Sequence, residues 1–172
     1  MNLAKTIRVI EDFPKPGISF KDITTLLENA DAFQYAIKEM AAFCKQRDID
    51  MVVGVESRGF ILGAPLAYEL GLGFVLIRKQ GKLPGEVLRV EYDLEYGKDA
   101  LEIHKDAVTP DMNIVLVDDL LATGGTMGAA AKLVEKIGAN IRGFAFLIEL
   151  ESLNGRKNLT GYDILTLVRY RK

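Results

Sequence analysis

The sequence has little that would build disulfides or membrane segments. Its only cysteine is Cys44, so no internal disulfide can form, and a reducing compartment suits the chain. No apolar run approaches the length of a membrane span. Charged residues also interrupt the first residues before a stretch long enough for a signal peptide appears. We therefore expect a cytoplasmic protein with no membrane partner.

An excess of charge of either sign is missing as well. The 22 lysines and arginines nearly balance the 24 aspartates and glutamates, which leaves a formal net charge of -2. This balance provides no general attraction to nucleic acid or to anionic lipid. Any phosphate group must therefore be bound by local basic residues, and we expect no nucleic-acid partner.

The composition that remains is typical of one compact domain. The 172 residues are 49% hydrophobic and 27% charged, and the chain shows no internal repeat, low-complexity segment or linker. We expect a single domain over residues 1–172.

Short apolar strands alternate along the chain with helical patterns. Strands are predicted at residues 51–56, 73–79, 113–119, 141–150 and 162–170, and helices from Phe33 onward and at residues 59–71 and 126–137. Alternation of buried strands with helices indicates the α/β class, with a mostly parallel sheet flanked by helices on both faces. Residues 80–98 break the rhythm with glycines, a proline and interleaved charges, and their second half alternates like an exposed hairpin. We interpret them as a mobile excursion.

The segment VLVDDLLATGGT, residues 115–126, ends an apolar strand with two adjacent carboxylates, Asp118 and Asp119. Ligands of parallel α/β sheets bind beyond the carboxyl ends of the strands. A helix that begins near Thr126 would present free backbone N–H groups, and Gly124 and Gly125 would let a phosphate come close to them. Because carboxylates repel phosphate, the two acids need hydroxyl donors or a cation. A ribose 5-phosphate meets both requirements.

Other interpretations of this segment were weighed. The acids could merely cap a helix, with the glycines forming a turn. The segment lacks the Gly-Lys-Ser/Thr ending of a nucleoside-triphosphate loop and the G-x-G-x-x-G pattern of dinucleotide-binding folds.

VLVDDLLATGGT resembles the phosphoribosyl pyrophosphate loop of the type I phosphoribosyltransferases. The resemblance is strongest to the adenine-specific members of that family and extends along almost the whole chain. The segments that support it are DFPKPGISFKDIT (12–24), ESRGFILG (56–63), LIRKQGKLPG (76–85) and YDLEYGKDALEIHKDA (92–107).

This resemblance implies a reaction and an architecture. Adenine and phosphoribosyl pyrophosphate would give AMP and pyrophosphate, with Mg²⁺ carried mainly by the diphosphate substrate and with no metal ligand from the protein. The fold would be that of the family, in which a central, mostly parallel sheet carries a small hood and a flexible lid loop. A homodimer is expected too.

The resemblance also assigns residues to the phosphoribosyl pyrophosphate site. The ribose 5-phosphate would contact Asp118, Asp119, Ala122, Thr123, Gly124, Gly125 and Thr126. Arg58 would act in catalysis and hold the pyrophosphate, in a loop with an unusual cis peptide near Glu56 and Ser57. Lys79 and Lys82 would reach the same pyrophosphate, although a solvated surface position is the usual place for a lysine.

The base site is expected around GISFKD. Phe20 would stack on adenine, with an ordinary core position as the alternative. Backbone groups at Ser19 and Lys21 would read the base edge, and Leu150 would close the far side. Family members commonly have arginine in place of Lys21, so no role is assigned to its side chain.

The proton of adenine requires an acid or base near the base ring. Relatives specific for 6-oxopurines carry an aspartate where this chain has Ala122, so the resemblance transfers that task to Glu95, with Tyr96 beside it in the lid. A solvated charge is the alternative for Glu95. His104, the only histidine, is expected on the surface or in the hairpin.

Two other functions were considered. A regulatory protein of this fold would carry an additional N-terminal DNA-binding domain, for which residues 1–21 are too short. A simple nucleotide-binding module would need neither the pyrophosphate cations nor Glu95.

Overall fold

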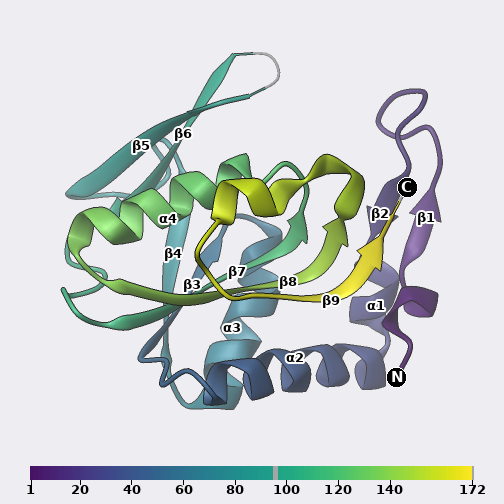
Figure 1. Cartoon of the computed structure of the whole chain (residues 1–172), viewed down its shortest axis with the longest axis horizontal. Helices are drawn as coiled ribbons and strands as arrows, with labels where there is room; N and C mark the ends of the chain where they lie inside the picture. The colour runs from purple at the N-terminus through teal and green to yellow at the C-terminus, as the bar shows by residue number, and fades with distance from the viewer. Residues whose placement is uncertain (95–96, 172) are drawn as a thin grey trace.

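The computed structural model describes residues 1–94 and 97–171 (Figure 1). Its elements in chain order are η1 (Leu3–Thr6), β1 (Arg8–Ile10), β2 (Phe20–Asp22), α1 (Thr24–Glu28), α2 (Ala30–Lys45), β3 (Met51–Val55), α3 (Arg58–Leu70), β4 (Gly73–Lys79), β5 (Val87–Asp93), β6 (Lys98–His104), β7 (Asn113–Leu121), α4 (Gly125–Ile137), β8 (Asn140–Leu150), η2 (Glu151–Leu153), η3 (Gly155–Leu159) and β9 (Ile164–Tyr170). The elements labelled η are 3₁₀ helices. No helix of the described residues has both the length and the apolarity needed to cross a bilayer.

Seven strands form the central sheet in the order β5-β6-β4-β3-β7-β8-β9. The five strands β4, β3, β7, β8 and β9 each run parallel to their neighbours in this order. The β5–β6 hairpin joins the edge of β4 in antiparallel orientation. The prediction of a mostly parallel sheet is therefore confirmed.

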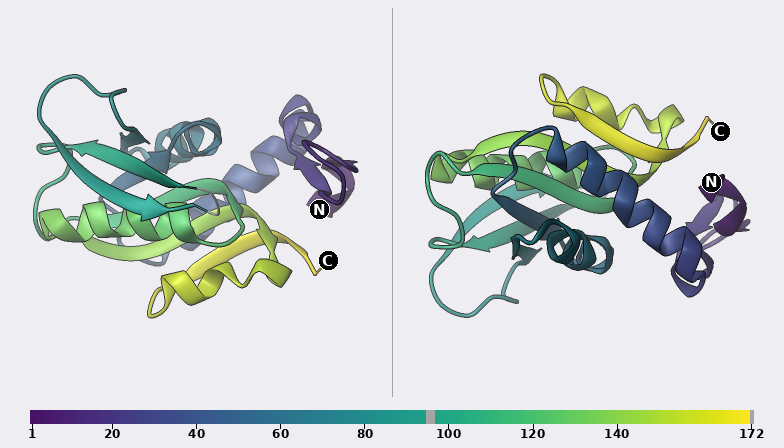
Figure 2. Two further views of the ribbon diagram at one scale, coloured as in Figure 1. Left: turned by 90° about the horizontal axis from the view of Figure 1, so that it is seen from above. Right: turned by 90° about the horizontal axis from the view of Figure 1, so that it is seen from below.

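Helices cover both faces of this sheet. In Figure 1, α4 lies above the sheet and α2 and α3 lie below it, and the two views of Figure 2 agree. Each face has its own core, because neighbouring side chains of a strand point to opposite sides. Val52 of β3 belongs to the cluster with α2 and α3, and Val53 belongs to the cluster with α4.

The helix boundaries follow local chemistry. The side chain of Asn29 accepts a hydrogen bond from Ala32 N at 3.0 Å, so α2 begins at Ala30, ahead of the predicted Phe33. The left-handed backbone of Gly138 ends α4 at Ile137.

The hairpin of β1 and β2 forms a second, two-stranded sheet, which we call the hood (Figure 1). It lies beside the end of β9, where Lys21 Nζ is 4.6 Å from the ring centroid of Tyr170. The sequence analysis anticipated a hood but not its strands, because each has three residues and shows no periodicity.

The prediction of an exposed hairpin in the second half of residues 80–98 was wrong in its bounds, because that range holds only β5 and the second strand, β6, begins at Lys98. β6 extends to His104, and Leu101 and Ile103 within it are fully buried. The hairpin is thus part of the core at its base. The tip is not described, because Glu95 and Tyr96 lie outside the described residues.

Candidate active site

A pocket of about 200 Å³ opens where β7 ends and α4 begins. It is lined by Arg58 and by every residue from Asp118 to Met127. β7 pairs with β3, and Arg58 follows β3 at the start of α3, so the ends of two neighbouring strands meet at the pocket. This is the edge at which parallel α/β sheets bind ligands.

The two acids of the pocket differ in their surroundings. Asp118 packs against Gly59 of α3, where a Cβ would lie 3.2 Å from Asp118 Oδ1. Burial and the adjacent charge of Asp119 raise the pKa of Asp118 well above its usual value. Asp119 is 5% exposed, and its Oδ2 lies 2.5 Å from Nε of Arg58. Only one acid of the pair therefore has a cationic partner within the described residues.

The glycine loop turns β7 into α4. Gly124 has a φ of +80°, a conformation that glycine adopts without strain, and Gly125 begins the helix. The first N–H groups of a helix have no partner within the helix. With the positive end of the helix dipole, they make this end of α4 a suitable anion site.

Arg58 lies where the sequence placed it, directly after the β3 strand. The peptide bond between Glu56 and Ser57 is cis, as the family resemblance implied. The side chain of Arg58 is 45% exposed, so its guanidinium borders the pocket while it pairs with Asp119.

Neither predicted lysine lines this pocket. Lys79, the last residue of β4, donates to the side chains of Asp99 and Tyr92 in the β5–β6 hairpin. Burial disfavours the charge of Lys79, but these two partners outweigh it and raise its pKa. Lys82 follows β4 and is exposed.

The predicted base segment also lies outside the pocket lining, in the hood and at the end of β8. Phe20 is half-buried and belongs to neither core cluster, and its ring meets that of Phe13 edge-on at 5.2 Å between centroids. Lys21 Nζ donates to Ser19 Oγ at 2.7 Å. Leu150, which was expected to close the far side of the base site, lies opposite Tyr170 in the β8–β9 pairing. Tyr170 is also the residue whose ring Lys21 contacts.

Glu95 and Tyr96, the expected acid-base and lid residues, are outside the described residues. His104 ends β6, and its Nε2 is 2.7 Å from the carbonyl oxygen of Pro84, which confirms its expected place in the hairpin.

Known proteins resemble this chain in sequence and in fold. Residues 9–167 match the model of the phosphoribosyl transferase domain. A curated adenine phosphoribosyltransferase of Clostridium perfringens (strain SM101 / Type A) is 61% identical over 170 residues, which cover 99% of both chains. The chain belongs to the adenine phosphoribosyltransferases.

Solved structures of adenine phosphoribosyltransferases share the fold. The enzyme of Thermoanaerobacter pseudethanolicus has a TM-score of 0.94 and 55% identity, with 98% of each chain covered. That of Saccharomyces cerevisiae, complexed with an imino-altritol bisphosphate and adenine, has a TM-score of 0.92 and 40% identity, with 96% of each chain covered. As an adenine phosphoribosyltransferase, the chain is an enzyme of the glycosyltransferase class, in agreement with the first hypothesis from its sequence.

Two residues near the site of this adenine phosphoribosyltransferase make contacts that the sequence did not predict, Glu56 and Asp99. Glu56 Oε1 accepts from the backbone N–H of Lys79 at 2.6 Å and lies 3.3 Å from Arg78 Nε, so it joins the ends of β3 and β4. Its position directly after an apolar strand was a signal of this role. Asp99 gave no such signal, because its contact with Lys79 depends on how β4, β5 and β6 pair.

Proposed function

We propose that the pocket at the ends of β3 and β7 transfers the phosphoribosyl group of phosphoribosyl pyrophosphate to N9 of adenine. AMP and pyrophosphate are the products, and the reaction serves purine salvage. The observation that carries the proposal is the pocket itself, in which two acids and one arginine adjoin a glycine loop at a helix N-terminus. The identity of the base, adenine, is inferred from the family to which the chain belongs.

The phosphoribosyl half of the substrate has a complementary surface. Asp118 and Asp119 accept hydrogen bonds from the ribose hydroxyls, and the backbone N–H groups of residues 122–126 bind the 5-phosphate. The acids and the loop line one pocket, and this supports the assignment, because the ribose and its 5-phosphate belong to one molecule.

Departure of pyrophosphate from C1′ requires cations near several negative charges. Arg58 has a planar guanidinium that holds two phosphate oxygens at once. In the present structure it pairs with Asp119, so pyrophosphate would compete with that carboxylate for Arg58. Lys79 ends β4 and Lys82 follows three residues later, and both are assigned to the same leaving group.

The two acids of the pocket suit a Mg²⁺ ion that arrives with the diphosphate. Magnesium is usually bound through substrate phosphates, so the diphosphate would carry the ion, and its charge would lie near Asp118 and Asp119 without either acid serving as a ligand. When bound, the ion neutralises part of the charge that develops on the leaving group.

Adenine is assigned to the hood side of the site. The ring of Phe20 stacks on the base, and its position outside both core clusters supports this assignment over a core role. Backbone groups at Ser19 and Lys21 read the base edge, and Leu150 closes the opposite side.

Removal of the adenine proton is assigned to Glu95, with Tyr96 beside it. The support is the sequence resemblance together with Ala122, which lines the pocket and has no ionisable group. An acid from another segment must therefore act at the base.

A homodimer is proposed as the active form, in the cytoplasm. Its support is an exposed apolar face of α3, on which Ile61 is 41% and Tyr68 90% exposed, with Leu76 of β4 39% exposed. Ile61 and Tyr68 are seven positions apart and so share one side of the helix.

The test of the reaction is a base-specificity assay. The purified chain, Mg²⁺ and phosphoribosyl pyrophosphate are incubated separately with adenine, hypoxanthine and guanine, and the nucleotides formed are quantified. We expect AMP from adenine, little product from either 6-oxopurine, and a large loss of AMP formation in a D118N/D119N variant that remains folded. Faster conversion of hypoxanthine, or unchanged AMP formation by the double variant, would contradict the proposal.

A further inference from the structure

The 3₁₀ helix η3 does not line the pocket, but it packs against the glycine loop of residues 122–126. Gly155, the first residue of η3, lies against the loop so closely that a Cβ on it would overlap the carbonyl oxygen of Ala122. A Cβ on Gly124 would in turn overlap the carbonyl oxygen of Gly155. Loop and η3 are therefore in direct backbone contact.

One side chain of η3 holds the loop by a hydrogen bond. Asn158 Nδ2 donates to the carbonyl oxygen of Thr123 at 2.7 Å. In a trans peptide unit the carbonyl and the following N–H point in opposite directions. The bond that draws the Thr123 carbonyl toward Asn158 thus turns the N–H of Gly124 away from Asn158, toward the side of the loop that lines the pocket.

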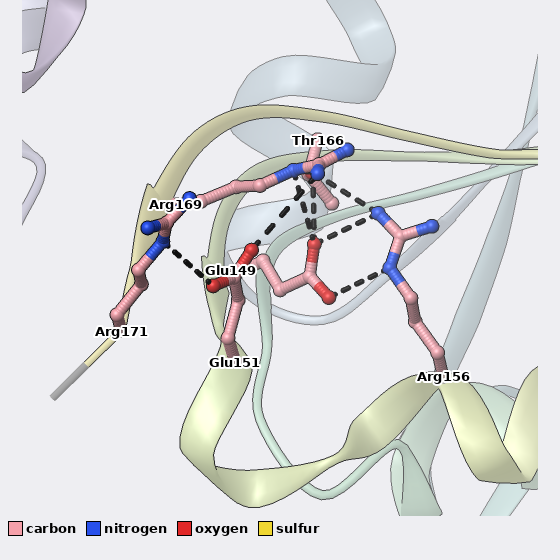
Figure 3. Close-up of polar contacts among 6 residues, drawn as sticks. All are labelled: Glu149, Glu151, Arg156, Thr166, Arg169 and Arg171. Carbon is pink, nitrogen blue, oxygen red and sulfur yellow. Dashed lines mark hydrogen bonds and ion pairs between the residues drawn. The ribbon is translucent and has the colours of Figure 1, made fainter.

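η3 is itself fixed to the sheet by a cluster of charged residues (Figure 3). Arg156 of η3 makes two hydrogen bonds to the carboxylate of Glu149, at 2.7 and 2.8 Å, and a third to Thr166 Oγ1 of β9 at 3.2 Å. Glu149 is 5% exposed and lies opposite Leu121, directly before the loop, in the β7–β8 pairing. Asn158 is thereby carried by a rigidly anchored segment.

We propose that Asn158 is a positioning residue for the 5-phosphate. Its amide keeps the Thr123 carbonyl turned away from the pocket, so that the Gly124 N–H faces the phosphate and no carbonyl dipole opposes it. The inference rests on the proposed function, because it deepens the assignment of residues 122–126 to the 5-phosphate. No role was given to Asn158 by the sequence, since 35 positions separate it from Thr123.

Two substitutions separate the hydrogen bond from the bulk of the side chain. Asn158→Leu keeps a similar volume, removes the donor and places an apolar side chain beside the Thr123 carbonyl. Asn158→Ala also removes the donor but lets water replace it. Ser152→Ala, an exposed and uncharged change in neighbouring η2, serves as the matched control.

The experiment measures binding by titration calorimetry, with AMP, ribose 5-phosphate, adenosine and pyrophosphate as ligands. For Asn158→Leu we expect Kd to rise about tenfold for AMP and ribose 5-phosphate, the effect of one lost hydrogen bond. Asn158→Ala should show a smaller rise and Ser152→Ala none. Adenosine and pyrophosphate lack the 5-phosphate, so their Kd should not change.

Three results would overturn the inference: unchanged AMP binding by Asn158→Leu, equal losses for AMP and adenosine, or a larger loss in Asn158→Ala than in Asn158→Leu. The wild-type chain is assayed in parallel for AMP formation from adenine. If it makes no AMP but binds ribose 5-phosphate in an Asn158-dependent way, the proposed function fails and this inference stands. If it makes AMP and Asn158→Leu binds normally, only this inference fails.

Discussion

At the scale of single residues, Asp118 is held where its charge is disfavoured. Its pKa is raised by burial and by Asp119, so the fold favours the protonated form. The resulting stabilisation is complete below the ordinary value of 3.8 and is lost as the pH rises through the folded-state pKa. At any pH above that folded-state pKa the charged side chain costs stability, and we infer that this cost is kept because the acid serves the site.

The variant Asp118→Asn removes that cost. We expect its urea midpoint at pH 7 to exceed that of the wild type while its turnover falls, because asparagine still accepts the Asp119 N–H bond but lacks the charge that attracts ribose hydroxyls. The stability difference should shrink as the pH falls through the folded-state pKa of Asp118, where the wild-type carboxyl gains its proton. A variant that is less stable than the wild type at pH 7 would show that the charge of Asp118 is compensated in the fold.

Arg58 gives a prediction that compares three ligands in one variant. Arg58→Ala should weaken binding of phosphoribosyl pyrophosphate and pyrophosphate by roughly 2 kcal/mol, the scale of a charge-assisted hydrogen bond, and that of AMP much less. AMP has no pyrophosphate for Arg58 to hold. Calorimetric titration checks this, and equal losses for all three ligands would count against the assignment.

Glu95 separates the adenine-specific chemistry from that of 6-oxopurine relatives. Glu95→Gln keeps a hydrogen bond but abolishes proton exchange, so single-turnover chemistry with adenine should fall by about 10²–10⁴-fold. Affinity for phosphoribosyl pyrophosphate should stay nearly unchanged, as measured by calorimetry. A fall of only a few-fold would limit Glu95 to a role in closing the site.

The sequence predicted the site positions of residues that lie close together in the chain. Asp118, Asp119 and the loop residues lie together because one strand-to-helix turn carries them all, and Arg58 joins them because β3 pairs with β7. The partners of Lys79 were out of reach of such reasoning. They depend on the register in which Tyr92 pairs with Asp99, and the sequence pattern does not specify that register.

At the scale of elements, the ion pair between Glu149 and Arg156 joins β8 to η3. The bonds from Arg156 hold the pKa of Glu149 below its ordinary value of 4.5. A depressed pKa adds stability that is fully present above that ordinary value and is lost as the pH falls through the folded-state pKa. The pair therefore matters at neutral pH and weakens only in acid.

Glu149→Gln should destabilise the fold by about 2 kcal/mol at pH 7, since a buried partner of Arg156 loses its charge. As the pH falls from 4.5 through the lower folded-state pKa of Glu149, the difference from the wild type should narrow, because the wild-type carboxylate then gains its proton. The matched control is Glu151→Gln, whose side chain is 31% exposed and lies 3.5 Å or more from its arginines. Urea unfolding across this pH range measures both variants, and equal effects at the two positions would argue against a special role for Glu149.

Periodicity predicted the long elements of this fold and missed the short ones. α4 shows apolar positions at helical spacing, and β3 and β7 are continuous apolar runs, so their types followed from the pattern. The hood strands and η3 are too short to show a period. Their structure comes from tertiary contacts, such as those of Lys21 with Tyr170 and of Gly155 with the loop.

At the scale of the whole molecule, the segment that precedes the hood shares a core with the large sheet. Leu3 and Ile7 belong to the same buried cluster as Val115 of β7 and Val168 of β9. We propose on this basis that residues 1–172 form one domain, and we expect fluorescence and circular dichroism to report coincident urea transitions. Separate transitions for the two probes would divide the chain into independent units.

The proposed dimer gives a second prediction at this scale. Light scattering at micromolar concentration should report twice the 19.0 kDa of one chain. Tyr68→Asp, which places a charge on the exposed face of α3, should shift the mass toward the monomer, whereas Lys132→Glu on α4 should not. A fully active species with the mass of one chain would contradict the dimer.

The close contact between loop and η3 also has an evolutionary consequence. Gly124 and Gly155 each face a backbone carbonyl where a side chain would have to stand, so a substitution at one cannot be compensated by a smaller residue at the other. Selection for phosphate binding at Gly124 therefore extends to Gly155, which does not line the pocket. Sequence drift should be free at exposed positions of η2 such as Ser152 and arrested at Gly155 of η3, so that a residue outside the pocket is as constrained as the residues that line it.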